Sequence, residues 1–156
     1  MYRLTIDNEQ PLTSITLDDV KLFIGITATD EDEMLEKMVN AALRYAEDYT
    51  GNVFAKADVT ILSSRDNILV VGKIDTEKEL NVTVDGNPVN AVVTGNNIHV
   101  GYSGLIEVKY STVENVPPPV AIFIMQEAAK MYERGVESIV IPDTKLLSRY
   151  VNLAVC

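Results

Sequence analysis

Residues 30–51 read DEDEMLEKMVNAALRYAEDYTG, and this stretch decides the first half of the fold. Its apolar residues recur every three or four positions, which is the spacing of one wide face of a helix. Asp30 is the expected N-cap, with Glu33 as its capping-box partner, and the acidic first turn matches the positive end of the helix dipole. Gly51 is the expected left-handed residue that ends the helix.

A shorter helix is expected just before this stretch, over residues 17–24. Thr16 is a plausible N-cap, and Asp19 three residues later completes a capping-box pattern. Gly25 ends the helix. We expect a short packing helix here rather than a functional element.

The hydrophobic period changes after Val53. From there apolar and polar residues alternate in short runs, which is typical of strands with one buried face. Asp85-Gly86 lies between two such runs and is a strong signal for a two-residue hairpin turn. Further strands are expected around 59–61, 68–71, 80–84, 89–93, 98–102 and 106–110.

Three prolines at 117–119 end the β-rich region and lead into a third helix, expected from about Pro119 to Arg134 with Gly135 as its stop. The first half of this helix, 120–125, is apolar all round. Such a helix is buried on several sides, by its own domain or by another subunit. A last short helix is expected from Pro142-Asp143 to Tyr150, with Asp143 as its cap, followed by an apolar tail.

The order of elements predicts an α+β fold: a small bundle of about four helices with an inserted antiparallel β-sheet region. We expect one domain over residues 1–156, with helical parts at 1–52 and 114–156 and a β-rich insert at 53–113. No internal repeat or flexible linker interrupts the sequence.

Charge and composition exclude several classes of protein. The 156 residues carry a net charge of −10, which disfavours a basic nucleic-acid-binding surface and adhesion to an anionic membrane. No stretch approaches the ~20 apolar residues of a membrane-spanning helix, and no signal peptide is recognisable. The single cysteine, Cys156, rules out an intrachain disulfide and favours an intracellular setting.

The sequence offers little catalytic material. The only histidine, His99, lies in an expected strand and is better explained as a half-exposed sheet residue than as a catalytic or metal-binding group. The acidic run 30–33 lacks the spacing of a calcium loop, and its consecutive side chains point in different directions. We therefore expect no enzyme, no cofactor and no metal. A hydrolase that uses a carboxylate pair stays a minor alternative, because such a pair is defined by distance rather than by sequence.

The C-terminal third has more apolar residues than a chain of this size needs for its core. Most are expected in the core, but the apolar tail suggests docking onto this fold or onto a neighbour. The candidate residues for an interface with another subunit or a partner protein are Met125, Met131, Leu147, Tyr150, Val151, Leu153 and Val155.

Several segments, in this order, resemble the head–tail connector (adaptor) proteins of tailed bacteriophages. They cover nearly the whole chain. The segments are 15–21 leading to 30–33, then 41–51, the strand 106–110, Val116-Pro117-Pro118 leading to the helix end 131–134, and finally 141–142 and 146–150.

The resemblance implies a structural virion protein that is made in the bacterial host cytoplasm and acts at the head–tail interface. Such proteins form a homo-oligomeric ring of about a dozen subunits under the portal protein, extend the DNA channel and carry the tail or a stopper protein. DNA would pass nearby without sequence-specific binding. Glu36, Glu47 and Asp48 are then candidates for an acidic face turned to solvent or to the channel. The alternative is a non-phage β-rich protein–protein interaction module with helical flanks and no catalysis.

Overall fold

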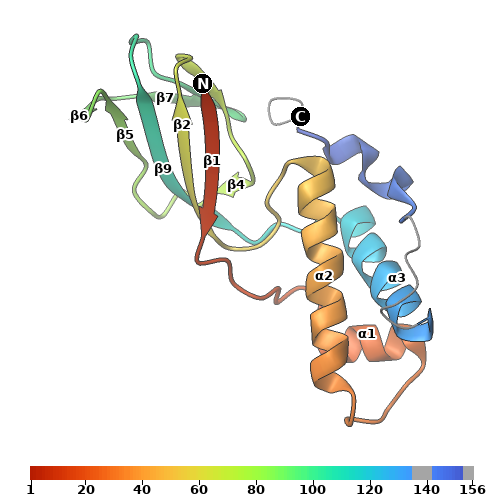
Figure 1. Ribbon diagram of the computed structural model, residues 1–156. Helices are drawn as coiled ribbons and strands as arrows, with labels where there is room; N and C mark the ends of the chain where they lie inside the picture. The colour runs from red at the N-terminus through yellow and green to blue at the C-terminus, as the bar shows by residue number, and fades with distance from the viewer. Residues whose placement is uncertain (135–141, 153–156) are drawn as a thin grey trace. The chain divides into compact units, whose positions relative to one another are not determined.

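The computed structural model describes residues 1–134 and 142–152, and the chain divides into two compact units (Figure 1). Residues 1–10 and 53–115 form a β unit, and residues 11–52 join the described residues from 116 onward in a helical unit. The expected α+β class is confirmed, with helices beside antiparallel sheets. The N-terminus differs from expectation, because the first ten residues belong to the β unit rather than to a helical part.

The β unit contains two antiparallel sheets. The larger sheet has the order β1-β2-β9-β5-β6, with β4 paired to the end of β9, and the smaller has the order β3-β8-β7. The strands are β1 (Tyr2–Asp7), β2 (Asp58–Ser63), β3 (Asn67–Leu69), β4 (Lys73–Ile74), β5 (Asn81–Val84), β6 (Asn87–Pro88), β7 (Val92–Thr94), β8 (Asn97–His99) and β9 (Ile106–Val113).

Alternation along the strands builds the core of the β unit. Every second residue of β2 and β9 is buried, and Ile61 lies opposite Val108 in the register of the two strands. Ile68 and Ile98 of the smaller sheet belong to the same apolar cluster. One face of each sheet is therefore removed from water, as the sequence period predicts.

The hairpin predicted at Asp85-Gly86 is confirmed. Val84 pairs with Asn87, and the two residues between them have φ angles of 50° and 84°. A two-residue turn with both φ angles positive matches the twist of the flanking strands, and Asp-Gly supplies those angles at low cost. Local sequence thus fixes the register of this part of the sheet.

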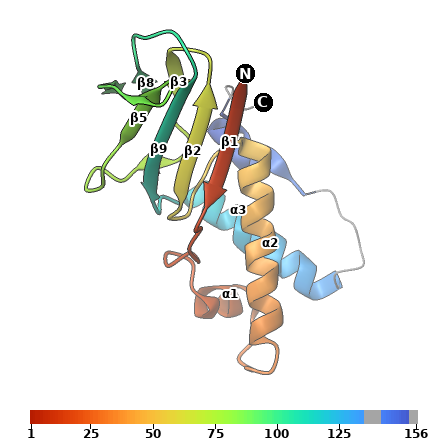
Figure 2. The ribbon, with the colours of Figure 1, turned by 60° about the vertical axis from the view of Figure 1, so that its left-hand side comes forward.

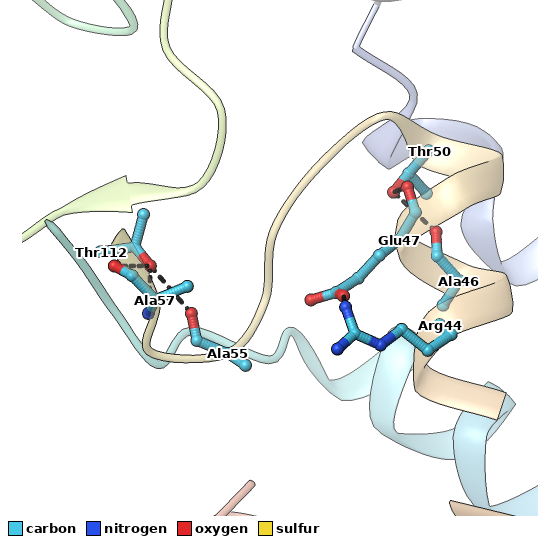
Figure 3. Close-up of polar contacts among 7 residues, drawn as sticks. All are labelled: Arg44, Ala46, Glu47, Thr50, Ala55, Ala57 and Thr112. Carbon is cyan, nitrogen blue, oxygen red and sulfur yellow. Dashed lines mark hydrogen bonds and ion pairs between the residues drawn. The ribbon is translucent and has the colours of Figure 1, made fainter. Parts of the chain in front are cut away.

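A buried threonine ties β9 to the segment that enters β2 (Figure 3). The Thr112 hydroxyl donates to the Ala55 carbonyl at 2.9 Å and accepts from the Ala57 amide at 3.0 Å. Gly72 packs closely on the other side, since a Cβ there would lie 2.9 Å from the Thr112 methyl group. These contacts satisfy backbone groups that the sheet itself leaves unpaired.

The helical unit consists of α1 (Leu17–Ile24), α2 (Asp32–Thr50), α3 (Pro118–Arg134) and the 3₁₀-helix η1 (Thr144–Tyr150). The Thr16–Asp19 capping box is present, and both Gly25 and Gly51 adopt the left-handed conformation. In no described part of the chain is a helix long and apolar enough to cross a membrane.

One expected cap is wrong. The N-cap of α2 is Glu31, which makes no side-chain cap hydrogen bond, rather than Asp30. The Asp32 amide donates to the Thr29 carbonyl at 3.2 Å, so a turn occupies the position where the cap was expected. The helix therefore starts later than the acidic run suggests.

α2 and α3 pack against each other: they run side by side in Figure 1, and in Figure 2 α3 passes behind α2 at an angle. The rings of Tyr45 and Phe123 stack with centroids 6.0 Å apart, and the Tyr132 hydroxyl donates to the Glu31 carboxylate at the other end of the pair. This hydrogen bond, together with burial, raises the pKa of Tyr132.

Lys21 of α1 is buried and forms an ion pair with Asp32, which joins α1 to the start of α2.

Candidate functional site

An apolar groove lies between α1 and the first half of α3. Its volume is about 440 Å³. The residues that line it are Ser14, Ile15, Asp19, Leu22, Phe23, Ala121 and Met125. All of them belong to the helical unit, so the groove is a feature of that unit alone.

The groove is bordered by large apolar side chains that face water. Leu22 is 84% exposed and Phe23 is 49% exposed. An eight-residue helix can bury only one face, and Leu22 lies about 200° around α1 from the buried Val20. Contiguous apolar exposure of this kind marks an interaction site rather than a core.

The first half of α3, expected to be apolar all round, divides between two environments. Val120, Phe123 and Ile124 are buried, whereas Ile122 is exposed and Met125 lines the groove. The inner residues supply the core of the helical unit. On the outer side, Met125 and Ala121 line the groove.

One carboxylate stands at the groove. Asp19 accepts hydrogen bonds from the Thr16 backbone amide at 2.9 Å and from its hydroxyl at 2.7 Å. Both hydrogen bonds lower the pKa of Asp19, and the bond from the Thr16 backbone amide has the larger effect. The groove thus combines an apolar floor with a fixed negative charge.

The interface candidates of the C-terminal region lie in different environments in the structure. Met125 lines the groove, and Met131 is half-buried on α3. Leu147 is fully buried, so its placement at a subunit or portal interface is corrected: η1 packs on α2 and α3, and Leu147 fills the core there.

The chain after η1 is held to its own helical unit as far as Asn152. Tyr150 and Val151 are half-buried, and the amide of the buried Asn152 donates to the Thr50 carbonyl at the end of α2. The interface candidates Leu153 and Val155 lie outside the described residues.

The acidic candidates of α2 do not share one environment. Glu36 and Asp48 are exposed, and Glu36 also borders a hollow of about 470 Å³ formed with residues 11–17. Glu47 is only 5% exposed, so its assignment to an acidic surface is corrected (Figure 3).

The helix period explains why Glu47 is buried. It lies four residues after Leu43 and three before Thr50, and both of these are buried, so all three occupy one face of α2. Its carboxylate lies 3.8 Å from the Arg44 guanidinium, which compensates the buried charge. The Thr50 hydroxyl donates to the Ala46 carbonyl at 2.7 Å on the same face.

The β unit has little that resembles a catalytic centre. His99 is exposed on β8, where it pairs with Asn67 and Val92 of the neighbouring strands. Among residues 1–134 and 142–152, no group of three or more His, Cys, Asp or Glu side chains is placed to hold a metal ion.

Elements in this order, with a paired α2–α3 core and a β insert, match a known family. A family model described as phage gp6-like head-tail connector protein matches residues 14–141. The chain belongs to this family. It is a head–tail connector, a structural component of a phage-like particle, and the resemblance expected from the sequence is confirmed.

Three solved structures share the fold of the connector chain. A chain in the neck of an empty GTA particle, computed with C6 symmetry, is 17% identical with a TM-score of 0.67, and the match covers 94% of both chains. A chain in the virion of a native gene transfer agent (GTA) particle is 15% identical with a TM-score of 0.71, again over 94% of both chains.

The third structure is the neck of a native GTA particle computed with C12 symmetry. It is 14% identical with a TM-score of 0.59, and the match covers 91% of this chain and 93% of that chain. No curated protein matches the sequence. The family decides between the two readings left open above, because a non-phage interaction module does not account for the match over 14–141.

Proposed function

We propose that this connector forms a ring of about a dozen subunits beneath the portal of a DNA-filled capsid, where it extends the DNA channel and carries the tail or a stopper protein. The role is structural, because the family is one of structural connectors, and no catalysis is assigned. The family match carries the proposal, and the apolar groove of the helical unit supports it. A closed ring needs two different, complementary faces on each subunit, and the groove suits one of them.

The ring is tested by replacing Leu22 with aspartate. The purified chain, alone and with the portal protein of the same genome, is imaged by negative-stain electron microscopy and weighed by native mass spectrometry. We expect rings from the natural chain and none from Leu22→Asp, because a charge in the groove leaves an unpaired carboxylate inside an apolar contact.

The matched control is Val92→Asp, which places the same charge at another exposed apolar residue, 64% exposed, in the β unit. It should leave the ring intact. Circular dichroism of both variants checks that they remain folded. If Leu22→Asp still forms rings, the groove is not part of the contact between subunits. If the natural chain stays monomeric in the presence of the portal protein, the ring itself is contradicted.

We further propose that Glu36 and Asp48 turn toward the channel, where negative charge repels the DNA backbone. Replacing both residues with lysine raises the net charge of each subunit by four units. We expect the variant ring to bind duplex DNA at least about tenfold more tightly at low salt, with an affinity that falls steeply as salt rises, because new phosphate contacts release counterions. Fluorescence anisotropy with a labelled duplex measures the affinity.

Glu77→Lys with Glu79→Lys is the control, since these exposed residues give the same charge change in the β unit. Equal DNA binding by the two double variants would mean that net charge, and not the position of Glu36 and Asp48, governs the contact. Particles carrying the channel variant should also eject DNA more slowly than particles carrying the control.

A further inference from the structure

β1 is the longest strand at an edge of either sheet. It ends the larger sheet, and among the described strands it pairs with β2 alone, through six consecutive residue pairs without a bulge. The opposite edge, β6, is two residues long and contains Pro88, which cannot extend a ladder. Natural sheets protect their edges by such devices, and β1 has neither a proline nor a bulge.

Within the described part of the chain, the hydrogen-bond alternation of β1 leaves three residues with free backbone groups. The Ser64 amide donates to the Met1 carbonyl at 3.1 Å, and these residues extend the β1–β2 register, so the odd-numbered residues of β1 are those bonded to β2. The amides and carbonyls of Tyr2, Leu4 and Ile6 therefore point to the open edge. A second strand has three residues with which to form a ladder.

One antiparallel register makes β1 complementary to itself. With Thr5 opposite Thr5 of a second copy, Leu4 lies opposite Ile6 and Arg3 lies opposite Asp7, each pair occurring twice about the two-fold axis. Leu4 and Ile6 are the residues with free backbone groups, so both exchange hydrogen bonds across the edge. The odd-numbered residues then form non-hydrogen-bonded pairs, in which side chains approach most closely.

The charges favour this register over its neighbour. Within the described residues neither Arg3 nor Asp7 forms an ion pair, whereas Asp58, opposite Asp7 on β2, accepts hydrogen bonds from Asn8 and Ser111. The second copy's Arg3 would stand on the open side of Asp7 and give its carboxylate a cationic partner. Shifting the register by two residues places Arg3 opposite Thr5 and loses both ion pairs.

The apolar side of β1 is also completed by a second copy. Leu4 packs against the core cluster of the β unit yet is only half-buried, and Ile6 is half-buried as well. A neighbouring strand would cover both side chains and continue the buried face of the sheet. We propose that two copies of this chain pair antiparallel along β1, with Thr5 on the two-fold axis and Arg3–Asp7 ion pairs on either side.

This pairing is a contact separate from the proposed ring. It is isologous, so it ends at two chains and cannot by itself close a ring. The test therefore uses the Leu22→Asp chain, in which the groove is blocked. Pairing along β1 is then measured whether or not the groove builds a ring.

The first experiment places a cysteine on the axis, with Cys156→Ser removing the natural thiol. In this register the two Thr5 Cα atoms lie about 4.5 Å apart, within the range of a disulfide. We expect Thr5→Cys to form a disulfide-linked dimer under oxidised glutathione at least about tenfold faster than Thr60→Cys, its neighbour on the inner strand β2. Equal rates would overturn the pairing, and faster linkage through Leu4→Cys would overturn the register.

The second experiment exchanges the charges. Arg3→Asp places two aspartates opposite each other and should weaken the dimer at least about tenfold in sedimentation equilibrium, whereas Arg3→Asp with Asp7→Arg should restore it. Thermal unfolding by circular dichroism confirms that both variants are folded. A dimer that Arg3→Asp leaves unchanged, or a double variant that stays dissociated, would contradict the ion pairs on which the register depends.

Discussion

Phe123→Ala is expected to lower the free energy of unfolding of the helical unit by about 3–5 kcal/mol, because it removes a fully buried aromatic ring and leaves a cavity. Phe123 is 1% exposed in α3 and stacks on Tyr45 of α2 with ring centroids 6.0 Å apart. The substitution thus removes both the largest of the fully buried side chains and an aromatic contact between these two helices. Chemical denaturation followed by far-ultraviolet circular dichroism measures the loss.

The neighbouring residue supplies the control. Ile122→Ala truncates a side chain of the same helix that is 42% exposed, so it should change stability by much less. Hydrogen exchange of the Phe123→Ala chain should show lost protection in α2 and α3 and retained protection in β2 and β9, since the β unit has a core of its own. Equal loss in both units would mean that they unfold together.

The parts of the fold that were predicted from sequence are those that local chemistry fixes. Thr16 and Asp19 bond to each other across three residues, and Asp85-Gly86 has the turn angles that its residue types favour. Each of these features needs only neighbours in the chain. The helix face of α2 is equally local, because its period is visible in the residues themselves.

The sequence analysis does not predict β1, because the strand that stabilises it lies far away in the chain. Residues 2–7 alternate too briefly to identify a strand, and their partner β2 begins at Asp58. Glu47 was misplaced for a different reason: residue type suggested the surface, although its spacing from Leu43 and Thr50 indicated the buried face. Charge type and helix period disagreed at this position, and the period was the better guide.

The groove could be predicted only in part. The apolar character of 120–125 indicated a helix contacted on several sides, and Met125 was among the interface candidates. The sequence predicts only that Leu22 and Phe23 belong to a short packing helix. Their exposure follows from the shortness of α1 and from where α3 crosses it, and that placement is not visible in the sequence.

Tyr110→Phe is expected to destabilise the β unit by about 2–4 kcal/mol, although it removes one oxygen atom. The Tyr110 hydroxyl donates to the Val71 carbonyl at 3.0 Å and accepts from the Val71 amide at 2.9 Å, and both residues are buried. Phenylalanine leaves these two backbone groups without a partner, and each orphaned buried group costs about 1–3 kcal/mol. Tyr102→Phe, at an exposed tyrosine, should change stability by less than about 0.5 kcal/mol.

The pH dependence tests whether the folded chain buries the Tyr110 phenol in its neutral form. Burial raises the pKa of Tyr110 far above its ordinary value, so the folded chain favours the neutral phenol. A raised pKa means that this contribution is fully present below the ordinary pKa of about 10 and is lost as the pH rises further. The natural chain should therefore lose stability above pH 10 by denaturant titration, and Tyr110→Phe should lose markedly less over the same range. An identical alkaline loss in both chains would mean that a group other than Tyr110 titrates over this range.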